Sequence, residues 1–87
     1  MADVRLPATL VPLFAELPRR LDLDAATVLD AIDRLDARWP GLRDRLCDRG
    51  PALRPHINVF VDGAQAGLDT TLEPRSRLDV IAAISGG

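Results

Sequence analysis

The sequence contains no lysine and no tyrosine, and cysteine, histidine and tryptophan occur once each in its 87 residues. A single thiol, Cys47, excludes an internal disulfide framework and a cysteine-rich zinc module, because both need several thiols at fixed spacing. This sparse use of cysteine fits a reducing cytoplasm. All eleven basic residues are arginine, so the chain offers no lysine amine for acylation.

Aromatic residues and positive charge are also scarce. Aromatic residues make up 3% of the chain and the formal net charge is −2, whereas a nucleic-acid surface needs excess positive charge and stacking rings. Charges and prolines interrupt the first 14 residues, and no other apolar run approaches the length of a membrane span. We therefore expect no nucleic-acid partner and no membrane partner.

The composition is that of one small folded domain, with 47% hydrophobic and 28% charged residues. Alternation of apolar and polar residues predicts strands over residues 3–6, 20–23, 57–61 and 78–82. The pair Asp62 and Gly63 follows the third strand and is typical of a tight hairpin turn. We expect the chain to fold back along that strand.

Apolar residues recur at three- and four-residue spacing from Thr27 to Trp39, which predicts one amphipathic helix. Asp24 is expected to cap the N-terminus of this helix, because a side-chain oxygen there can accept from a free backbone N–H. Pro40 and Gly41 are expected to end it.

The remaining segments have weaker patterns. Residues 42–46 are expected to form a short helical turn, with Cys47 on the same helix as an inert, partly buried thiol. Prolines in residues 9–18 and 50–55 predict a packed loop and an irregular connection, respectively. The side chains expected to pack from the first loop are Leu10, Leu13 and Phe14.

These elements predict an α+β fold in which a mixed sheet of four to five strands wraps over one main helix. Two strands, a helix, a hairpin and a final strand pack most economically in this way, which is the β-grasp or ubiquitin-like arrangement. We place the folded domain at residues 1–82 and a flexible C-terminal tail at residues 83–87.

The sequence shows no pattern typical of an enzyme active site. His56 is the only histidine and has no evident partner of the kind that an imidazole base needs. Most aspartates in residues 22–36 lie on the polar face of the predicted helix among arginines, which favours a solvated surface over a metal site. We expect no metal, no bound cofactor and no catalytic activity of its own.

The chain ends in Gly86 and Gly87, shortly after the predicted last strand. Glycine lacks a Cβ atom, so such a tail can pass through a narrow channel in a partner. A carboxylate reacts with weak nucleophiles only after its oxygen becomes a good leaving group, as in an acyl adenylate formed from ATP. A frayed terminus rich in small residues is the alternative interpretation.

Four segments along nearly the whole chain carry a family resemblance: residues 26–43, HINVFVDG at 56–63, GLDT at 67–70 and AISGG at 83–87. Together they resemble the MoaD/ThiS family of ubiquitin-like sulfur carriers. Within that family the pattern is most similar to carriers of cysteine biosynthesis and to the small subunit of molybdopterin synthase. Carriers for the thiamine thiazole are usually shorter and lack the segment at residues 42–55.

The resemblance implies that a separate ubiquitin-activating-type adenylating enzyme uses MgATP to adenylate Gly87. A sulfurtransferase or other sulfur donor then converts the adenylate to a C-terminal thiocarboxylate. The carrier passes this sulfur to a sulfur-accepting biosynthetic enzyme, with cysteine, molybdopterin or another sulfur-containing metabolite as the product. The chain is then a protein cosubstrate rather than an enzyme.

A docking surface follows from strand alternation. If the odd-numbered residues of the strand at 57–61 face the helix, Phe60 and Ile81 point to the opposite face of the sheet. Exposed apolar side chains on a sheet often mark an interface. We expect both residues, together with Ile84 and Ser85 of the tail, to contact the adenylating enzyme. Ordinary scattered surface apolarity is the alternative.

Two other functions stay open. The activated tail of a protein modifier would acylate lysines of other proteins through Gly87. In a non-covalent β-grasp interaction module, Gly86 and Gly87 would have no chemistry at all.

Overall fold

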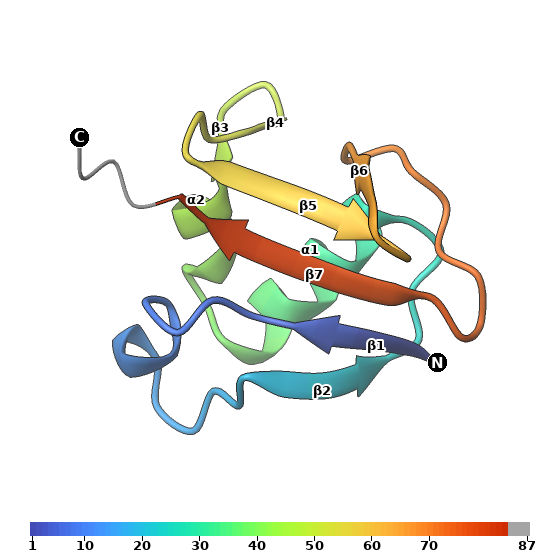
Figure 1. The fold of residues 1–87 in the computed structure, drawn as a ribbon. Coiled ribbons are helices and arrows are strands. Elements are labelled where there is room, and N and C mark those ends of the chain that lie inside the picture. The colour runs from blue at the N-terminus through green and yellow to red at the C-terminus, as the bar shows by residue number, and fades with distance from the viewer. Residues whose placement is uncertain (84–87) are drawn as a thin grey trace.

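A computed structural model describes residues 1–83 and shows a mixed β-sheet that curves over two helices (Figure 1). The described part of the chain contains seven strands, two α-helices and one short 3-10 turn. In chain order these are β1 (Ala2–Arg5), the 3-10 turn (Val11–Leu13), β2 (Arg20–Leu23), α1 (Val28–Arg38), α2 (Leu42–Leu46), β3 (Cys47–Asp48), β4 (Ala52–Leu53), β5 (Ile57–Val61), β6 (Ala64–Ala66) and β7 (Arg77–Ala82).

The main sheet has five strands in the order β2-β1-β7-β5-β6. The first and last strands, β1 and β7, lie side by side and run parallel, whereas the other pairings in this sheet are antiparallel (Figure 1). This is the predicted β-grasp arrangement, with five strands and α1 as the main helix. β7 therefore carries the chain out from the middle of the sheet.

The start of α1 differs from the prediction. Thr27, not Asp24, caps the helix, and its Oγ1 accepts from the Asp30 N–H at 3.1 Å. The backbone of Thr27 forms a β-bridge with Thr71, so the chain is still extended there and the helix cannot begin earlier. A backbone hydrogen bond from Ala26, followed by the bond from a neighbouring arginine, lowers the pKa of the Asp30 carboxyl. That carboxylate therefore helps to close the first turn of the helix.

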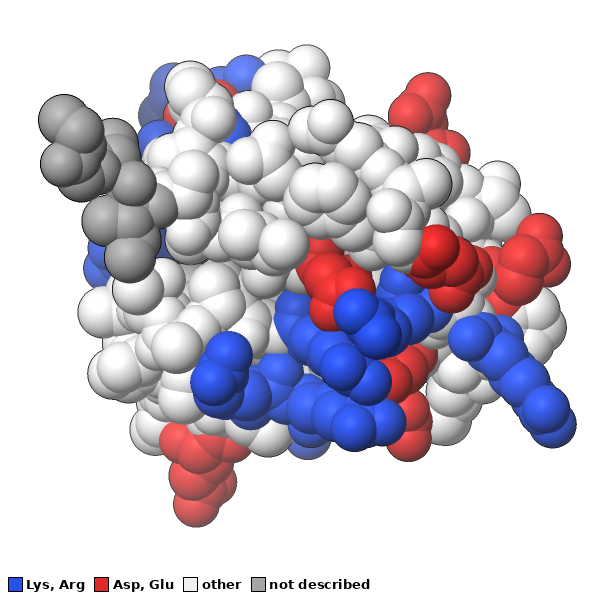
Figure 2. Space-filling view, viewed as in Figure 1, with Lys and Arg blue, Asp and Glu red and all other residues white. Residues whose placement is uncertain are grey.

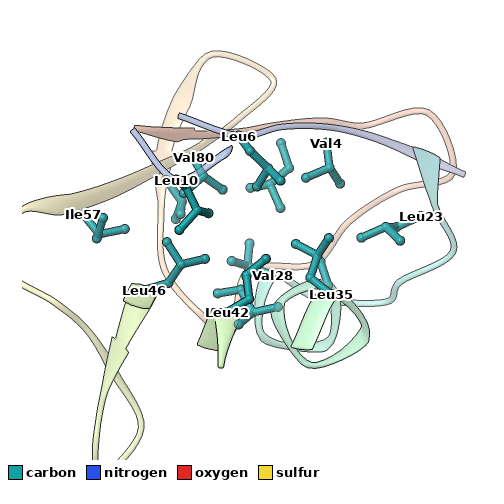
Figure 3. Close-up of a cluster of buried hydrophobic side chains, with 14 of the residues drawn as sticks. Val4, Leu6, Leu10, Leu23, Val28, Leu35, Leu42, Leu46, Ile57 and Val80 are labelled. Atoms are coloured by element: carbon teal, nitrogen blue, oxygen red, sulfur yellow. The ribbon is translucent and has the colours of Figure 1, made fainter. Parts of the chain in front are cut away.

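The core lies between the sheet and the helices. Val4, Val59 and Leu78 extend from three strands, Ile32 and Leu35 extend from α1, and all five side chains are fully buried. Figure 3 shows Val4 on the sheet side of this cluster and Leu35 on the helix side. The predicted alternation is therefore confirmed, because each of these strands turns every second side chain to the core.

Cys47 lies in a two-stranded ladder rather than on a helix. β3 pairs antiparallel with β4, and Gly50 adopts a φ of +112° in the turn between them. The irregular connection predicted for residues 50–55 is therefore partly wrong. Strands of two residues are too short to show alternation in the sequence. The Arg54 N–H donates to the Leu46 C=O at 2.9 Å and holds the ladder against α2.

The environment of Cys47 makes its thiol unreactive. The residue is only 4% exposed, and burial raises the pKa of the thiol above its ordinary value. The thiol is therefore protonated near neutral pH, whereas the thiolate is the nucleophilic form.

The loop between β1 and β2 differs from the prediction at one residue. Leu10 is buried and Phe14 packs against the core, as expected, but Leu13 is 51% exposed. Leu13 ends the 3-10 turn at the surface, where it lines a hollow instead of entering the core.

The helices found within residues 1–83 are too short or too polar to cross a lipid bilayer.

Candidate functional site at the end of strand β7

β7 leads into the predicted tail. The Ala83 N–H, just beyond the strand, donates to the His56 C=O at 2.7 Å. The sheet therefore holds the backbone up to the last described residue, and the boundary proposed between residues 82 and 83 stays a prediction. The predicted reactive and contact residues of the tail lie outside the described residues: Ile84, Ser85, Gly86 and Gly87.

Phe60 and Ile81 lie on the outer face of the sheet, which is the face opposite α1. Phe60 is directly opposite Asp79, and Ile81 is directly opposite Asn58, so the two apolar side chains are diagonal neighbours on one face. Ile81 is 47% exposed and Phe60 is half-buried. The structure thus brings together two of the predicted contact residues, beside the end of β7. Their binding to a partner stays a prediction.

Charged residues surround this apolar pair on the outer face, and Figure 2 shows arginines and acidic residues gathered there. Asp3 pairs with Arg20 at 3.1 Å and with Arg5 at 3.3 Å, and Arg77 pairs with Asp79 at 2.8 Å. Burial raises the pKa of the Asp3 carboxyl, but the two arginines outweigh burial and lower it overall. The polar positions of the alternating strands could have indicated this cluster, since they share one face.

A hollow of about 260 Å³ lies at the end of β7, and Ala83 forms part of its lining. Leu13 and Ile57 form part of its apolar wall, and Arg45 and His56 add polar groups. Sequence reasoning assigned no role to this place, because its residues come from distant parts of the chain. Within residues 1–83, no three histidine, cysteine or acidic side chains are grouped closely enough to hold a metal ion.

The sequence matches a known family over nearly its whole length. The model of the ThiS family matches residues 4–87, from β1 to the final glycine of the sequence. The chain belongs to the ThiS family. This confirms the resemblance to ubiquitin-like carriers, which the motifs at residues 56–63 and 83–87 indicated.

Relatives of this ThiS-family chain include a curated protein and solved structures. Small archaeal modifier protein 1 of Haloferax volcanii is 35% identical over 83 residues, which cover 86% of this chain and 95% of that protein. Its crystal structure has a TM-score of 0.78 at 32% identity and covers 99% of this chain and 98% of that one. A chain in the crystal structure of the BexX/CysO complex of Amycolatopsis orientalis has a TM-score of 0.86 at 26% identity, with both chains fully covered.

These likenesses place the ThiS-family chain among small ubiquitin-like carrier and modifier proteins. Proteins of this family are small carriers and not catalysts. The relatives are nearly the same length as this chain, so the likeness applies to the whole fold and not to a part of it.

Proposed function

We propose that this chain is a sulfur carrier whose reactive group is the carboxylate of Gly87. The observation that carries the proposal is the family match, which continues in the sequence beyond the described end of the central strand β7 to Gly86 and Gly87. A separate ubiquitin-activating-type enzyme would bind MgATP and the tail together. The chain itself would supply the carboxylate and the docking surface, with no cofactor of its own.

The chemistry requires two substitutions. A carboxylate oxygen of Gly87 attacks the α-phosphorus of ATP, and pyrophosphate leaves. Hydrosulfide (HS−), delivered by a sulfurtransferase or other sulfur donor, then attacks the carbonyl carbon, AMP leaves with one of the tail's oxygens, and the sulfur loses its proton to solvent. The resulting thiocarboxylate keeps an accessible sulfur nucleophile on a protein, ready for transfer to a sulfur-accepting biosynthetic enzyme.

The tail residues have distinct roles in this proposal. Gly86 and Gly87 pass through the channel of the activating enzyme because neither carries a Cβ atom. Ile84 and Ser85 contact the enzyme ahead of them. Four extended residues beyond Ala83 span at most about 14 Å, so the enzyme must also dock close to the end of β7. A cytoplasmic location, where ATP is available, belongs to the same proposal.

A protein modifier is the second candidate, and a relative's name supports it. The chain is 35% identical to a protein called small archaeal modifier protein 1. A lysine amine of a target protein would then attack the same acyl adenylate. AMP would leave, and an amide would form at Gly87. The absence of lysine means that this chain cannot build lysine-linked chains on itself.

Pyrophosphate exchange tests the first step. Incubation with a purified ubiquitin-activating-type enzyme, MgATP and labelled pyrophosphate is expected to give labelled ATP only when the chain is present. The chain lacking Gly86 and Gly87 serves as the control and is expected to give none. Equal exchange with the truncated chain would contradict adenylation at Gly87, and no exchange with any such enzyme would favour a non-covalent interaction module.

A further inference from the structure

The edge of β7 that faces β1 is uncovered over its last residues. The hydrogen bond from the Ala83 N–H to the His56 C=O shows that Ala83 turns its backbone groups towards β5. Successive residues of a strand direct their backbone groups to the two neighbouring strands in turn, so every second residue before Ala83 also faces β5. Val80 and Ala82 therefore direct their backbone groups towards β1. The pairing of β1 with β7 ends at Asp79, so the Val80 N–H is the last backbone group of β7 that β1 reaches, and the Val80 C=O and Ala82 lie beyond it.

Pro7 is the reason that β1 stops short. It has no N–H to donate to the Val80 C=O, and its own C=O accepts from the Leu10 N–H at 3.0 Å, which turns the chain away. Within residues 1–83, the Val80 C=O and the Ala82 N–H consequently have no hydrogen-bond partner. A short open strand edge is a template for another strand.

A groove of about 470 Å³ runs along this open edge. Residues 6–9 form one wall, and Val80, Ile81 and Ala82 form the other. Ile81 adds an exposed apolar side chain at the rim. The groove therefore combines free backbone groups with an apolar surface, which is the combination that binds an extended peptide.

The charge of the groove is positive. Its charged lining consists of three arginines and Asp79, and the 2.8 Å bond from Arg77 neutralises that aspartate. Arg19 forms no ion pair within residues 1–83, and Arg5 shares Asp3 with another arginine. The Arg5 Nε is buried and has no hydrogen-bond partner among the described residues. Arg19 is thus available to a carboxylate, and Arg5 is only partly neutralised by the Asp3 that it shares.

We propose that this groove binds an extended acidic segment of the enzyme that acts on the C-terminus, added as a strand beside Val80–Ala82. The identity of the partner rests on the proposed function, whereas the chemistry of the segment rests on the groove. Its backbone N–H and C=O pair with Val80 and Ala82, its carboxylates bind Arg5 and Arg19, and an apolar side chain covers Ile81. A strand in this position runs alongside the last residues of β7.

An NMR titration tests the groove without any enzyme. The full ¹⁵N-labelled chain is titrated with a capped six-residue peptide of alternating glutamate and valine, and with the same peptide carrying lysine for glutamate. The glutamate peptide is expected to shift the amide signals of Val80, Ala82 and Arg19 and to slow hydrogen exchange at Ala82. The lysine peptide is expected to leave them unchanged.

Two variants with the same charge change sharpen the test. Arg19→Glu is expected to weaken binding of the glutamate peptide by about tenfold, because it replaces attraction by repulsion. Arg49→Glu makes the same charge change at an exposed residue between β3 and β4, outside the lining of the groove, and is expected to leave the affinity within about twofold, because salt screens exposed charges that are not in contact. Equal effects of the two variants would overturn the assignment.

Other results of the titration would overturn the proposal or reassign the open edge. No shift at residues 80–82, or equal shifts with both peptides, would overturn the proposal. Shifts that depend on protein concentration alone would assign the edge to a second copy of the chain instead. Because the titration uses no ATP, a chain that is adenylated but does not bind the peptide would retain the proposed function and lose only the groove.

Discussion

Replacement of Gly86 by valine is expected to abolish adenylation while the domain stays folded. In the proposed mechanism a branched side chain would meet the walls of a channel that admits only backbone, and it excludes the backbone angles that glycine allows. We expect kcat/KM for pyrophosphate exchange to fall by about a thousandfold or more, which corresponds to about 4 kcal/mol of transition-state binding. Among the described residues the buried core side chains lie in residues 2–80, so the unfolding midpoint is expected to stay the same.

Ala64→Val is the matched control for Gly86→Val. It adds methyl groups at an exposed residue of β6, a strand at the edge of the sheet, and is expected to leave exchange unchanged. Normal exchange by the Gly86→Val chain would mean that the tail does not enter a narrow channel. A lower unfolding midpoint for that variant would instead show that residue 86 contributes to the fold.

Phe60→Asp is expected to raise the KM for the chain in the same reaction by about a hundredfold, the size of effect seen when a central interface residue is lost. The substitution removes a half-buried ring from the outer face and places a carboxylate directly opposite Asp79. Two like charges at paired positions repel each other, and an apolar partner surface would have to desolvate both. The stability cost is expected to be about 1 kcal/mol, which urea unfolding measures.

Two further variants make this prediction specific to the outer face. Ile81→Asp changes a side chain that is 47% exposed, so it tests the same surface if Phe60→Asp proves unstable. Leu13→Asp changes a side chain that is 51% exposed but lies off the outer face, and it is expected to leave KM unchanged. Unaltered kinetics for both outer-face variants would remove this face from the docking surface.

Local patterns explain why most elements were predictable. The period-two alternation of β5 and β7 identifies both strands and their inward faces, and the pair Asp62 and Gly63 forms the turn with positive φ at both residues. Phe60 and Ile81 could be placed on the outer face for the same reason, because alternation alone decides the face.

Contacts between distant segments explain what was not predictable. The N-cap moved from Asp24 to Thr27 because a bridge to Thr71 holds the intervening chain extended. The open edge of β7 depends on the break at Pro7 and on the parallel pairing with β1. The proline marks the end of the first strand in the sequence, but the pairing of that strand with β7 has no local sequence pattern. The start of the helix and the open edge of β7 therefore become visible only when the pairing of distant strands is known.

Intact-protein mass spectrometry is the most direct test of the sulfur-carrier proposal. The chain is recovered after incubation with the adenylating enzyme, MgATP and a sulfur donor. Exchange of oxygen for sulfur at Gly87 is expected to add about 16 Da, because the glycine tail leaves the terminal carbonyl accessible to the donor. An unchanged mass together with adducts of whole proteins would contradict the sulfur carrier and support the modifier. An unchanged mass with no adduct would contradict both.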